Sequence, residues 1–305
     1  MNNQTGIVYG LTGDRSRSRV HGYHGKPNPL TLNKSKYKVD VAGLKPTALR
    51  NTIKFDGSDY TTKYTIGMEV EKCDLHRGAI KEYELFCGFE EDSSCGFEAV
   101  THILPLLPKS QWRNKVFDMV YKAEKIIDDN YSASNGSCGG HITIGVEGMT
   151  GDDIREAVRV NCGIVLALFR HRLKNKYCGA NRRMQARGLR EYNSADFDYV
   201  YDSNGWHWKY HTALVKGNVL EFRVVSRFQS VKQTMRRYEL FYELVDFSIN
   251  RPNGSHESFL KTIRPIVLSM YNGNEEDCDK IMKLAKHFRT FILSGEVHQD
   301  IARYL

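Results

Sequence analysis

The stretch Tyr64-Thr65-Ile66-Gly67-Met68-Glu69-Val70-Glu71 decides the prediction of the fold. Apolar and polar side chains alternate along it, which is the period of a half-buried β-strand. Three further runs, at 83–89, 97–101 and 141–145, predict strands of the same sheet, and the polar residues 90–94 predict a turn after the first of them. The chain therefore begins its ordered part with strands.

Helical periodicity dominates the rest of the chain. Apolar side chains recur at three- and four-residue steps over 109–129, and Gly-Asp-Asp opens a second predicted helix over 151–175. A hairpin is predicted from the strand-like runs 206–215 and 219–225, which Lys216-Gly217-Asn218 separates. The C-terminal pattern predicts helices at 231–249, 256–272 and 276–294, with breaks at Pro252-Asn253-Gly254 and Asn272-Gly273-Asn274. Strands followed by helices indicate the α+β class.

Composition limits the type of protein. The chain has 305 residues, 41% of them hydrophobic, which is enough for a substantial core. It contains no run of about 18 apolar residues, so no membrane span is expected. The N-terminus lacks the basic-then-apolar order of a secretion signal, and the seven cysteines follow no repeating spacing. These features predict a soluble cytoplasmic protein with reduced thiols.

The positive charge is unevenly distributed. The net charge is +8, and residues 1–60 carry ten basic and four acidic side chains. A second basic stretch, 170–190, contains no acidic residue. We expect three parts: a basic, partly ordered arm over 1–60, a catalytic domain over 61–250, and helices over 251–305 that pack on the same domain. The arm could be a solvated segment or a handle for a polyanion.

Acidic residues on the predicted strands are the first candidates for a functional site. Glu69 and Glu71 lie two residues apart on one strand, so both side chains point to the same face. Carboxylates on one face suit Mg²⁺, although most such pairs simply face solvent. Glu98, after a glycine turn, is of interest as a third carboxylate beside them.

Two further motifs add a histidine and an arginine. His141 follows Cys138-Gly139-Gly140 at the start of a strand, where it could bind metal or phosphate or serve as a structural hydrogen-bonding group. Glu221 and Arg223 repeat the two-residue spacing. They could pair with each other, or hold a metal ion and a phosphoryl group, which the forked donors of arginine fit well.

Taken together and in order, these motifs resemble the amidoligase family, whose relatives are the glutamine synthetases and the glutamate–cysteine ligases. The resemblance covers roughly residues 64–250. Thr143 stands where members of the family commonly carry a second histidine. The residues that carry the resemblance are Gly67-Met68-Glu69-Val70-Glu71, Asp92-Ser93-Ser94-Cys95-Gly96-Phe97-Glu98, Cys138-Gly139-Gly140-His141-Ile142-Thr143-Ile144, Arg172-Leu173-Lys174-Asn175-Lys176-Tyr177-Cys178 and Leu220-Glu221-Phe222-Arg223.

The resemblance implies a curved antiparallel sheet of the glutamine synthetase-like type, whose concave face binds ATP and Mg²⁺. It implies that an ATP-dependent carbon–nitrogen ligase joins a small-molecule or peptide carboxylate to an amine through an acyl phosphate, releasing ADP and phosphate. Glu71 and Arg223 are expected to carry the chemistry, and Arg223 to steady the transferred γ-phosphoryl group. His141, Arg172 and Arg223 are the expected nucleotide-binding residues. The expected metal ligands are Glu69, Glu71, Glu98, His141 and Glu221.

Other functions fit part of the sequence. A metal-dependent enzyme acting on nucleic acid would use the same carboxylates and would explain the basic stretches. The ligase could also act on a polyanionic or nucleic-acid-linked substrate, with the arm as its handle. A third possibility is an inactive member that keeps the fold as a binding protein. For the base that deprotonates the amine, the sequence offers Glu191, Asp196, Asp198 and His211 without selecting one.

Overall fold

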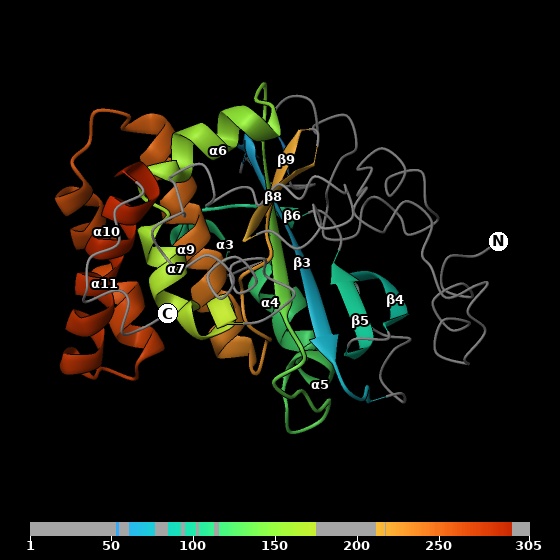
Figure 1. Ribbon diagram of the computed structural model, residues 1–305. Coiled ribbons are helices and arrows are strands. Elements are labelled where there is room, and N and C mark those ends of the chain that lie inside the picture. Colours follow the sequence, from blue (N-terminus) through green and yellow to red (C-terminus); the bar gives the residue numbers. More distant parts are fainter. Residues whose placement is uncertain are drawn as a thin grey trace, which may run out of the picture. The chain divides into compact units, whose positions relative to one another are not determined.

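The computed structural model describes residues 53–54, 61–76, 85–92, 95–101, 104–112, 116–174, 212–216 and 218–294 (Figure 1). These residues form two compact units. The first contains the described residues up to Met149 together with Arg227–Tyr238, and the second contains those from Thr150 to Ser226 together with the residues from Glu239 onward. In the described part of the chain, no helix combines the length and apolar character that crossing a bilayer requires.

An antiparallel sheet built around the strand β3 forms the centre of the first unit (Figure 1). The strand β3 pairs with β5 on one side and with β7 on the other, β4 extends the sheet beyond β5, and β6 pairs with the first part of β3. A separate short ladder joins β1 to β2. The bounds are β1 Ile53–Lys54, β2 Thr61–Thr62, β3 Tyr64–Lys72, β4 Phe86–Asp92, β5 Gly96–Thr101, β6 Leu104–Pro105 and β7 Gly140–Val146.

Burial alternates along β3, so one face of the strand lies in the core and the other is partly exposed. Tyr64, Ile66, Met68 and Val70 are almost completely buried and form one face of the strand. The intervening residues, which include Glu69, are only partly buried. The prediction of a half-buried strand at 64–71 is therefore confirmed, and the strand extends one residue further.

The predicted turn at 90–94 is wrong over residues 90–92. The strand β4 continues to Asp92 because Glu90, Glu91 and Asp92 pair with residues of β5. Pairing with a neighbouring strand overrides the low strand propensity of acidic residues.

Three short helices replace the single helix predicted over 109–129. They are α3 (Lys109–Trp112), α4 (Val116–Lys122) and α5 (Glu124–Ile127). After α5 the chain turns where the side chain of Asp128 accepts a hydrogen bond from the backbone N–H of Asn130, at 2.9 Å. Such an Asx turn competes with continued helix. The predicted apolar stripe is nevertheless buried at Val116, Met119, Val120, Ala123 and Ile127.

The second unit contains a hairpin and a layer of helices. The hairpin joins β8 (Ala213–Lys216) to β9 (Val219–Phe222), shorter than the predicted strands, and residues 206–211 lie outside the described part. The helices are α6 Gly151–Arg159, α7 Gly163–Leu168, the 3₁₀ helix η4 Arg170–Lys174, α9 Val231–Asn250, α10 His256–Met270 and α11 Glu275–Ser294. The first eight residues of α9 belong to the first unit.

The predicted helix over 151–175 is interrupted after Arg159. Thr150 caps α6 through a capping box with Asp153, so the cap lies one residue before the predicted Gly-Asp-Asp. At the start of α7, Gly163 packs so closely on α11 that a Cβ atom there would lie 2.2 Å from the carbonyl oxygen of Ala285. The break thus brings a residue without a side chain against the neighbouring helix.

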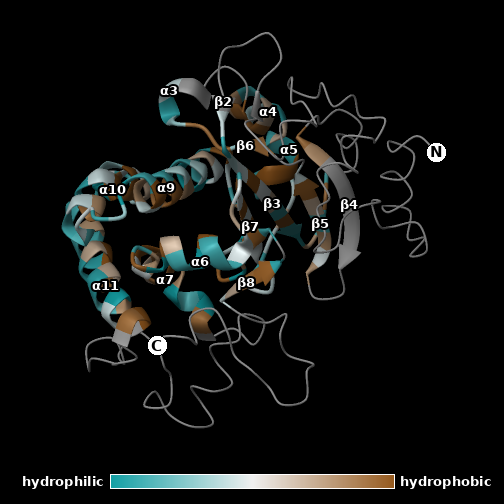
Figure 2. Ribbon diagram, turned by 90° about the horizontal axis from the view of Figure 1, so that it is seen from above, coloured by the Kyte–Doolittle hydropathy of each residue, from teal (hydrophilic) through white to brown (hydrophobic). Residues whose placement is uncertain are grey.

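The C-terminal helices are confirmed, as is the α+β class. The break after α10 includes Asn272 and Gly273, whose φ angles of 54° and 85° end the helix. Figure 2 shows polar and apolar residues alternating along α10 and α11, as expected for helices that bury one face. Phe259, Ile263, Leu284 and Phe288 belong to the buried faces.

Candidate metal centre

The register of the sheet brings four polar side chains of the first unit together. On β3, Glu71 lies directly opposite Glu98 of β5. Two residues earlier, Glu69 lies directly opposite His141 of β7. Residues directly opposite each other in an antiparallel pair share a face, with Cβ atoms about 4.5–5.5 Å apart. Strand pairing itself therefore gathers residues that are up to 72 positions apart in sequence.

Hydrogen bonds orient two of these side chains. The Nδ1 atom of His141 hydrogen-bonds to Glu69, and its Nε2 atom lies 3.5 Å from an Oε1 atom of Glu71. The backbone N–H of Gly139 donates to the other carboxylate oxygen of Glu71. In the tautomer in which Nδ1 donates to Glu69, Nε2 is the acceptor nitrogen and is available as a metal ligand. Glu69 thus orients the imidazole through this hydrogen bond. Its predicted role as a metal ligand stays a prediction.

Glu71, Glu98 and His141 form a compact and buried set of donors. Their exposed fractions are 8%, 6% and 8%, and one donor atom from each lies within 4.8 Å of the other two. Around an octahedral ion with bonds of about 2.1 Å, ligand atoms are separated by about 3 Å when adjacent and about 4.2 Å when opposite. Donor atoms 4.8 Å apart would have to approach by about 0.6 Å to become opposite ligands of one ion and by about 1.8 Å to become adjacent ligands, so the three side chains would have to move closer together to share an ion.

The chemistry of this donor set fits a divalent cation. Two carboxylates on adjacent strands repel each other, and burial strengthens this repulsion because the local dielectric constant is low. A cation bound between them would offset the repulsion. Carboxylate oxygens suit Mg²⁺, whereas the imidazole makes Mn²⁺ or Zn²⁺ equally suitable.

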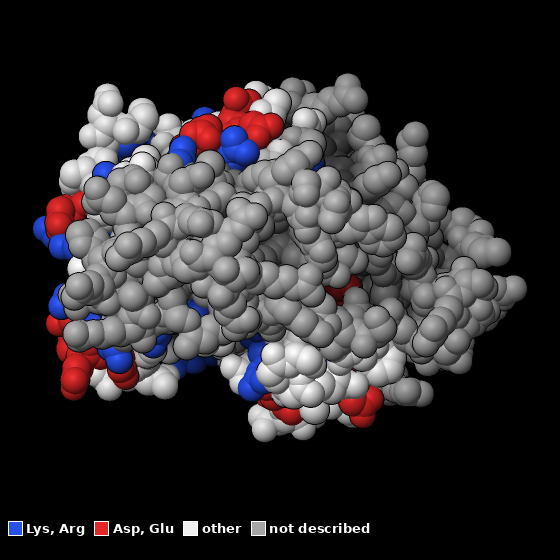
Figure 3. All heavy atoms as spheres, in the orientation of Figure 1, with Lys and Arg blue, Asp and Glu red and all other residues white. Residues whose placement is uncertain are grey.

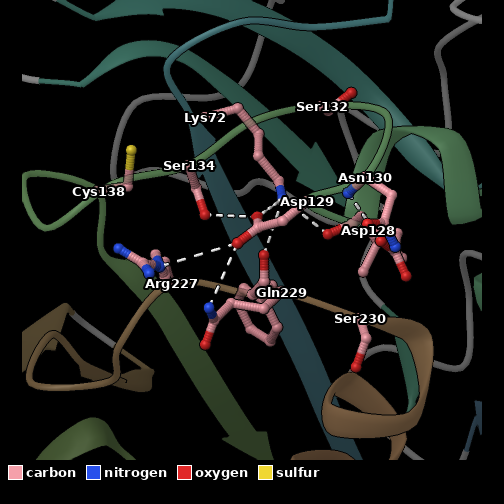
Figure 4. Close-up of polar contacts among 12 residues, drawn as sticks. Lys72, Asp128, Asp129, Asn130, Ser132, Ser134, Cys138, Arg227, Gln229 and Ser230 are labelled. Carbon is pink, nitrogen blue, oxygen red and sulfur yellow. Dashed lines mark hydrogen bonds and ion pairs between the residues drawn. The ribbon is translucent and has the colours of Figure 1, made fainter.

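A buried lysine, Lys72, fixes the end of β3 through contacts with the chain around Asp129 (Figure 4). The ammonium group of Lys72 donates to the carbonyl oxygens of Ile127 at 2.7 Å and Phe228 at 2.9 Å, and to the carboxylate of Asp129 at 2.8 Å. Burial lowers the pKa of Lys72. Burial alone would raise the pKa of Asp129, but hydrogen bonds from Lys72 and Ser134 outweigh it and hold that pKa below its usual value. These contacts tie β3 to the chain before α9.

The loop that leads into β7 is held at both ends. Near its start, the carbonyl oxygen of Ala133 accepts from the backbone N–H of Cys73 at 2.8 Å. Toward its end, Gly139 donates to Glu71. Between these points, the side chain of Asn135 accepts from the backbone and the hydroxyl group of Ser137. The loop therefore has little freedom to move independently of the centre.

The remaining predicted site residues belong to the second unit. Glu221 lies on β9 with no exposed surface, and its carboxylate contacts both Lys216 and Arg223. One of the two alternatives for Glu221 and Arg223, that they pair with each other, is therefore realised in this structure. Arg172 lies in η4 and is also buried. The roles of Glu221, Arg223 and Arg172 toward metal and phosphate stay predictions.

Sequence reasoning missed Lys72 and Glu90. Lys72 continues the buried face that starts at Tyr64. A lysine at a position where the alternation calls for an apolar side chain was therefore a signal in the sequence for a buried, hydrogen-bonded ammonium group. Glu90 was assigned to a turn, but in the register of β4 it stands opposite Glu98. A row of acidic positions thus crosses three strands, from Glu90 through Glu98 to Glu71.

Several predicted features lie outside the described residues. They include the arm before Ile53, most of the basic stretch 170–190, and the candidate bases Glu191, Asp196, Asp198 and His211. On the described surface in Figure 3, acidic and basic side chains are intermixed where α6 lies in Figure 1. There, Arg155 pairs with both Asp152 and Glu156. Exposed pairs of this type contribute little to stability.

Comparison with models of known protein families and with curated protein sequences gave no match to this chain.

Proposed function

We propose that the chain is a ligase that uses ATP and a divalent metal ion to join a carboxylate to an amine. The observation that carries this proposal is the buried donor set of Glu71, Glu98 and His141 on adjacent antiparallel strands. The motifs that supply these residues are those that resemble the amidoligases. The glutamine synthetase-like curvature of the sheet and the cytoplasmic location form part of the same proposal.

In this proposal the residues of the first unit hold and shape the metal site. Glu71, Glu98 and the Nε2 atom of His141 would be the ligands, and a bound divalent ion would neutralise phosphate oxygens of ATP. Glu69 keeps the imidazole in the required orientation, because it is hydrogen-bonded to Nδ1. The N–H of Gly139 restricts the rotation of the Glu71 carboxylate. Preorganised ligands of this kind lower the reorganisation needed when the ion binds.

Arginines would meet the charge of the transferred phosphoryl group. A carboxylate resists attack by an amine because it is negatively charged and would have to expel oxide. Phosphorylation converts it into an acyl phosphate with a stable leaving group, and the amine then displaces phosphate to give an amide. The guanidinium groups of Arg223 and Arg172 suit phosphate oxygens because they offer paired donors.

An assay that traps the acyl phosphate tests this proposal. The full chain is incubated with ATP, Mg²⁺ or Mn²⁺, pools of carboxylic acids and hydroxylamine, which converts acyl phosphates into hydroxamates. We expect ADP and hydroxamate to form in equal amounts and only with a suitable acid. Glu98→Gln should abolish both products, whereas Asp118→Asn, which changes an exposed acid on α4, should not.

Two outcomes would contradict the ligase. The first is the absence of ATP turnover with every acid pool and metal, although the folded protein binds the metal; this result would favour a binding protein. The second is hydrolysis of nucleic acid that requires Glu71 and Glu98. That result would assign the same centre to a metal-dependent nuclease.

A further inference from the structure

Two cysteines flank the candidate metal centre. Cys73 directly follows β3, two residues after Glu71, and Cys138 lies just before β7, next to Gly139. Their Sγ atoms are 3.5 Å apart. Because β3 and β7 are paired up to Val70 and Gly140, the contact lies immediately beyond the end of the ladder. The paired strands therefore bring the chain segments that carry the two sulfur atoms next to each other.

We propose that Cys73 and Cys138 form a reversible disulfide that controls the metal centre. A disulfide bond is about 2.05 Å long, so the two sulfur atoms have to approach by about 1.5 Å. This distance is within the reach of small rotations of the two side chains and of the chain beside them. The reduced pair thus stands close to bonding geometry.

A small disulfide of the glutathione type is the oxidant in this proposal. The sulfur of Cys73 attacks one sulfur of the small disulfide, giving a mixed disulfide and releasing one small thiol. The sulfur of Cys138 then attacks the Cys73 sulfur and releases the second thiol. Two protein thiols lose two electrons and two protons, and the small disulfide gains them. Cys73 reacts first because it is partly exposed, whereas Cys138 is only 2% exposed.

Contacts on both sides link the cysteine pair to the metal ligands. Movement of Cys138 carries Gly139 with it, and the N–H of Gly139 holds the carboxylate of Glu71. Movement of Cys73 displaces the end of β3 beyond Glu71, where the carbonyl oxygen of Ala133 accepts from the N–H of Cys73. Oxidation should therefore displace a ligand and weaken metal binding. This effect rests on the proposed metal centre, whereas formation of the disulfide does not.

Peptide mapping tests the disulfide directly. The full chain is equilibrated in buffers of reduced and oxidised glutathione, quenched with acid, alkylated and mapped by mass spectrometry. We expect a link between Cys73 and Cys138 that dithiothreitol reverses. Cys138→Ser should carry glutathione on Cys73 without an internal link. Cys95→Ser is the matched control, because the thiol of Cys95 donates to the carbonyl oxygen of Phe97 and a hydroxyl group keeps that donor.

Two results would overturn the proposal. One is that both cysteines stay alkylated in every buffer, or link to other cysteines, while circular dichroism shows a folded protein. The other is that oxidised and reduced chains bind Mn²⁺ equally well. We expect oxidation to weaken Mn²⁺ binding by about tenfold, which is the lower end of the range of losses in metal affinity found when groups next to metal ligands are changed. If neither form binds Mn²⁺, the proposed metal function fails, and the peptide map still decides on the disulfide.

Discussion

Replacing Lys72 by methionine removes a buried ammonium group and keeps most of the side-chain volume. The side chain of Lys72 has no exposed surface. Its ammonium group donates to two backbone carbonyl oxygens, of Ile127 and Phe228, and to the carboxylate of Asp129. All three acceptors lose this donor in Lys72→Met, and the thioether cannot replace it.

The expected loss of stability follows from the three acceptors. A buried hydrogen-bonding group left without its partner costs about 1–3 kcal/mol, so the two carbonyl groups together should cost at least about 2 kcal/mol. Asp129 adds less, because its side chain is 28% exposed and keeps hydrogen bonds from Ser134 and Gln229. Methionine carries no charge, so the cost of burying an ammonium group, which lowers the pKa of Lys72, is absent from the variant. We expect a net destabilisation of about 2–3 kcal/mol.

Urea unfolding followed by circular dichroism measures this loss. The control is Lys122→Met, which removes an exposed lysine on α4 and should change the free energy of unfolding by less than about 0.5 kcal/mol. Equal or greater stability of Lys72→Met would contradict a stabilising role for the three hydrogen bonds of Lys72. It would show that an apolar side chain replaces the ion pair without loss, as has been found for some buried pairs.

Three further substitutions test the packing and the electrostatics. Gly163→Ala should destabilise the fold by about 3 kcal/mol in urea unfolding, since its Cβ would lie 2.2 Å from the Ala285 carbonyl oxygen. Gly96→Ala should cost about 2 kcal/mol in the same assay, because Gly96 has a φ of +111°. Burial lowers the pKa of His256 to about 4, so between pH 6.5 and 4 the unfolded chain binds a proton that the folded chain does not. The free energy of unfolding of the wild type should therefore fall by about 1–2 kcal/mol as the pH drops through this window, a value reduced because His256 is partly exposed. Between pH 7 and 4.5, the free energy of unfolding of His256→Gln should fall less than that of the wild type.

Local patterns in the sequence were sufficient for the main elements. Alternation over 64–71 predicted β3, and the spacing of Glu69 and Glu71 predicted a shared face, as their common contact with His141 shows. The breaks before α10 and α11 were predicted from glycine-containing turns, and the structure has Gly273 at a φ of 85°. Short-range periodicity and turn chemistry decide such features.

Features that depend on pairing or on close packing were not predictable from local patterns. The strand β4 extends through three acidic residues because β5 pairs with them. After the interruption between α6 and α7, Gly163 packs closely on α11, more than 100 residues away in sequence. Likewise, Glu98 becomes part of the candidate centre only through its register with Glu71. A single sequence records the residues of such pairs but not their register.

Calorimetric titration with Mn²⁺ and Mg²⁺ decides whether β3 and β5 carry a metal centre. We expect one saturable site in the wild type that requires Glu71 and Glu98. Binding should be lost in Glu71→Gln and in Glu98→Gln and retained in Asp118→Asn, with all variants folded by circular dichroism. Absence of binding in the wild type, or unchanged binding in both glutamine variants, would contradict a metal centre on β3 and β5.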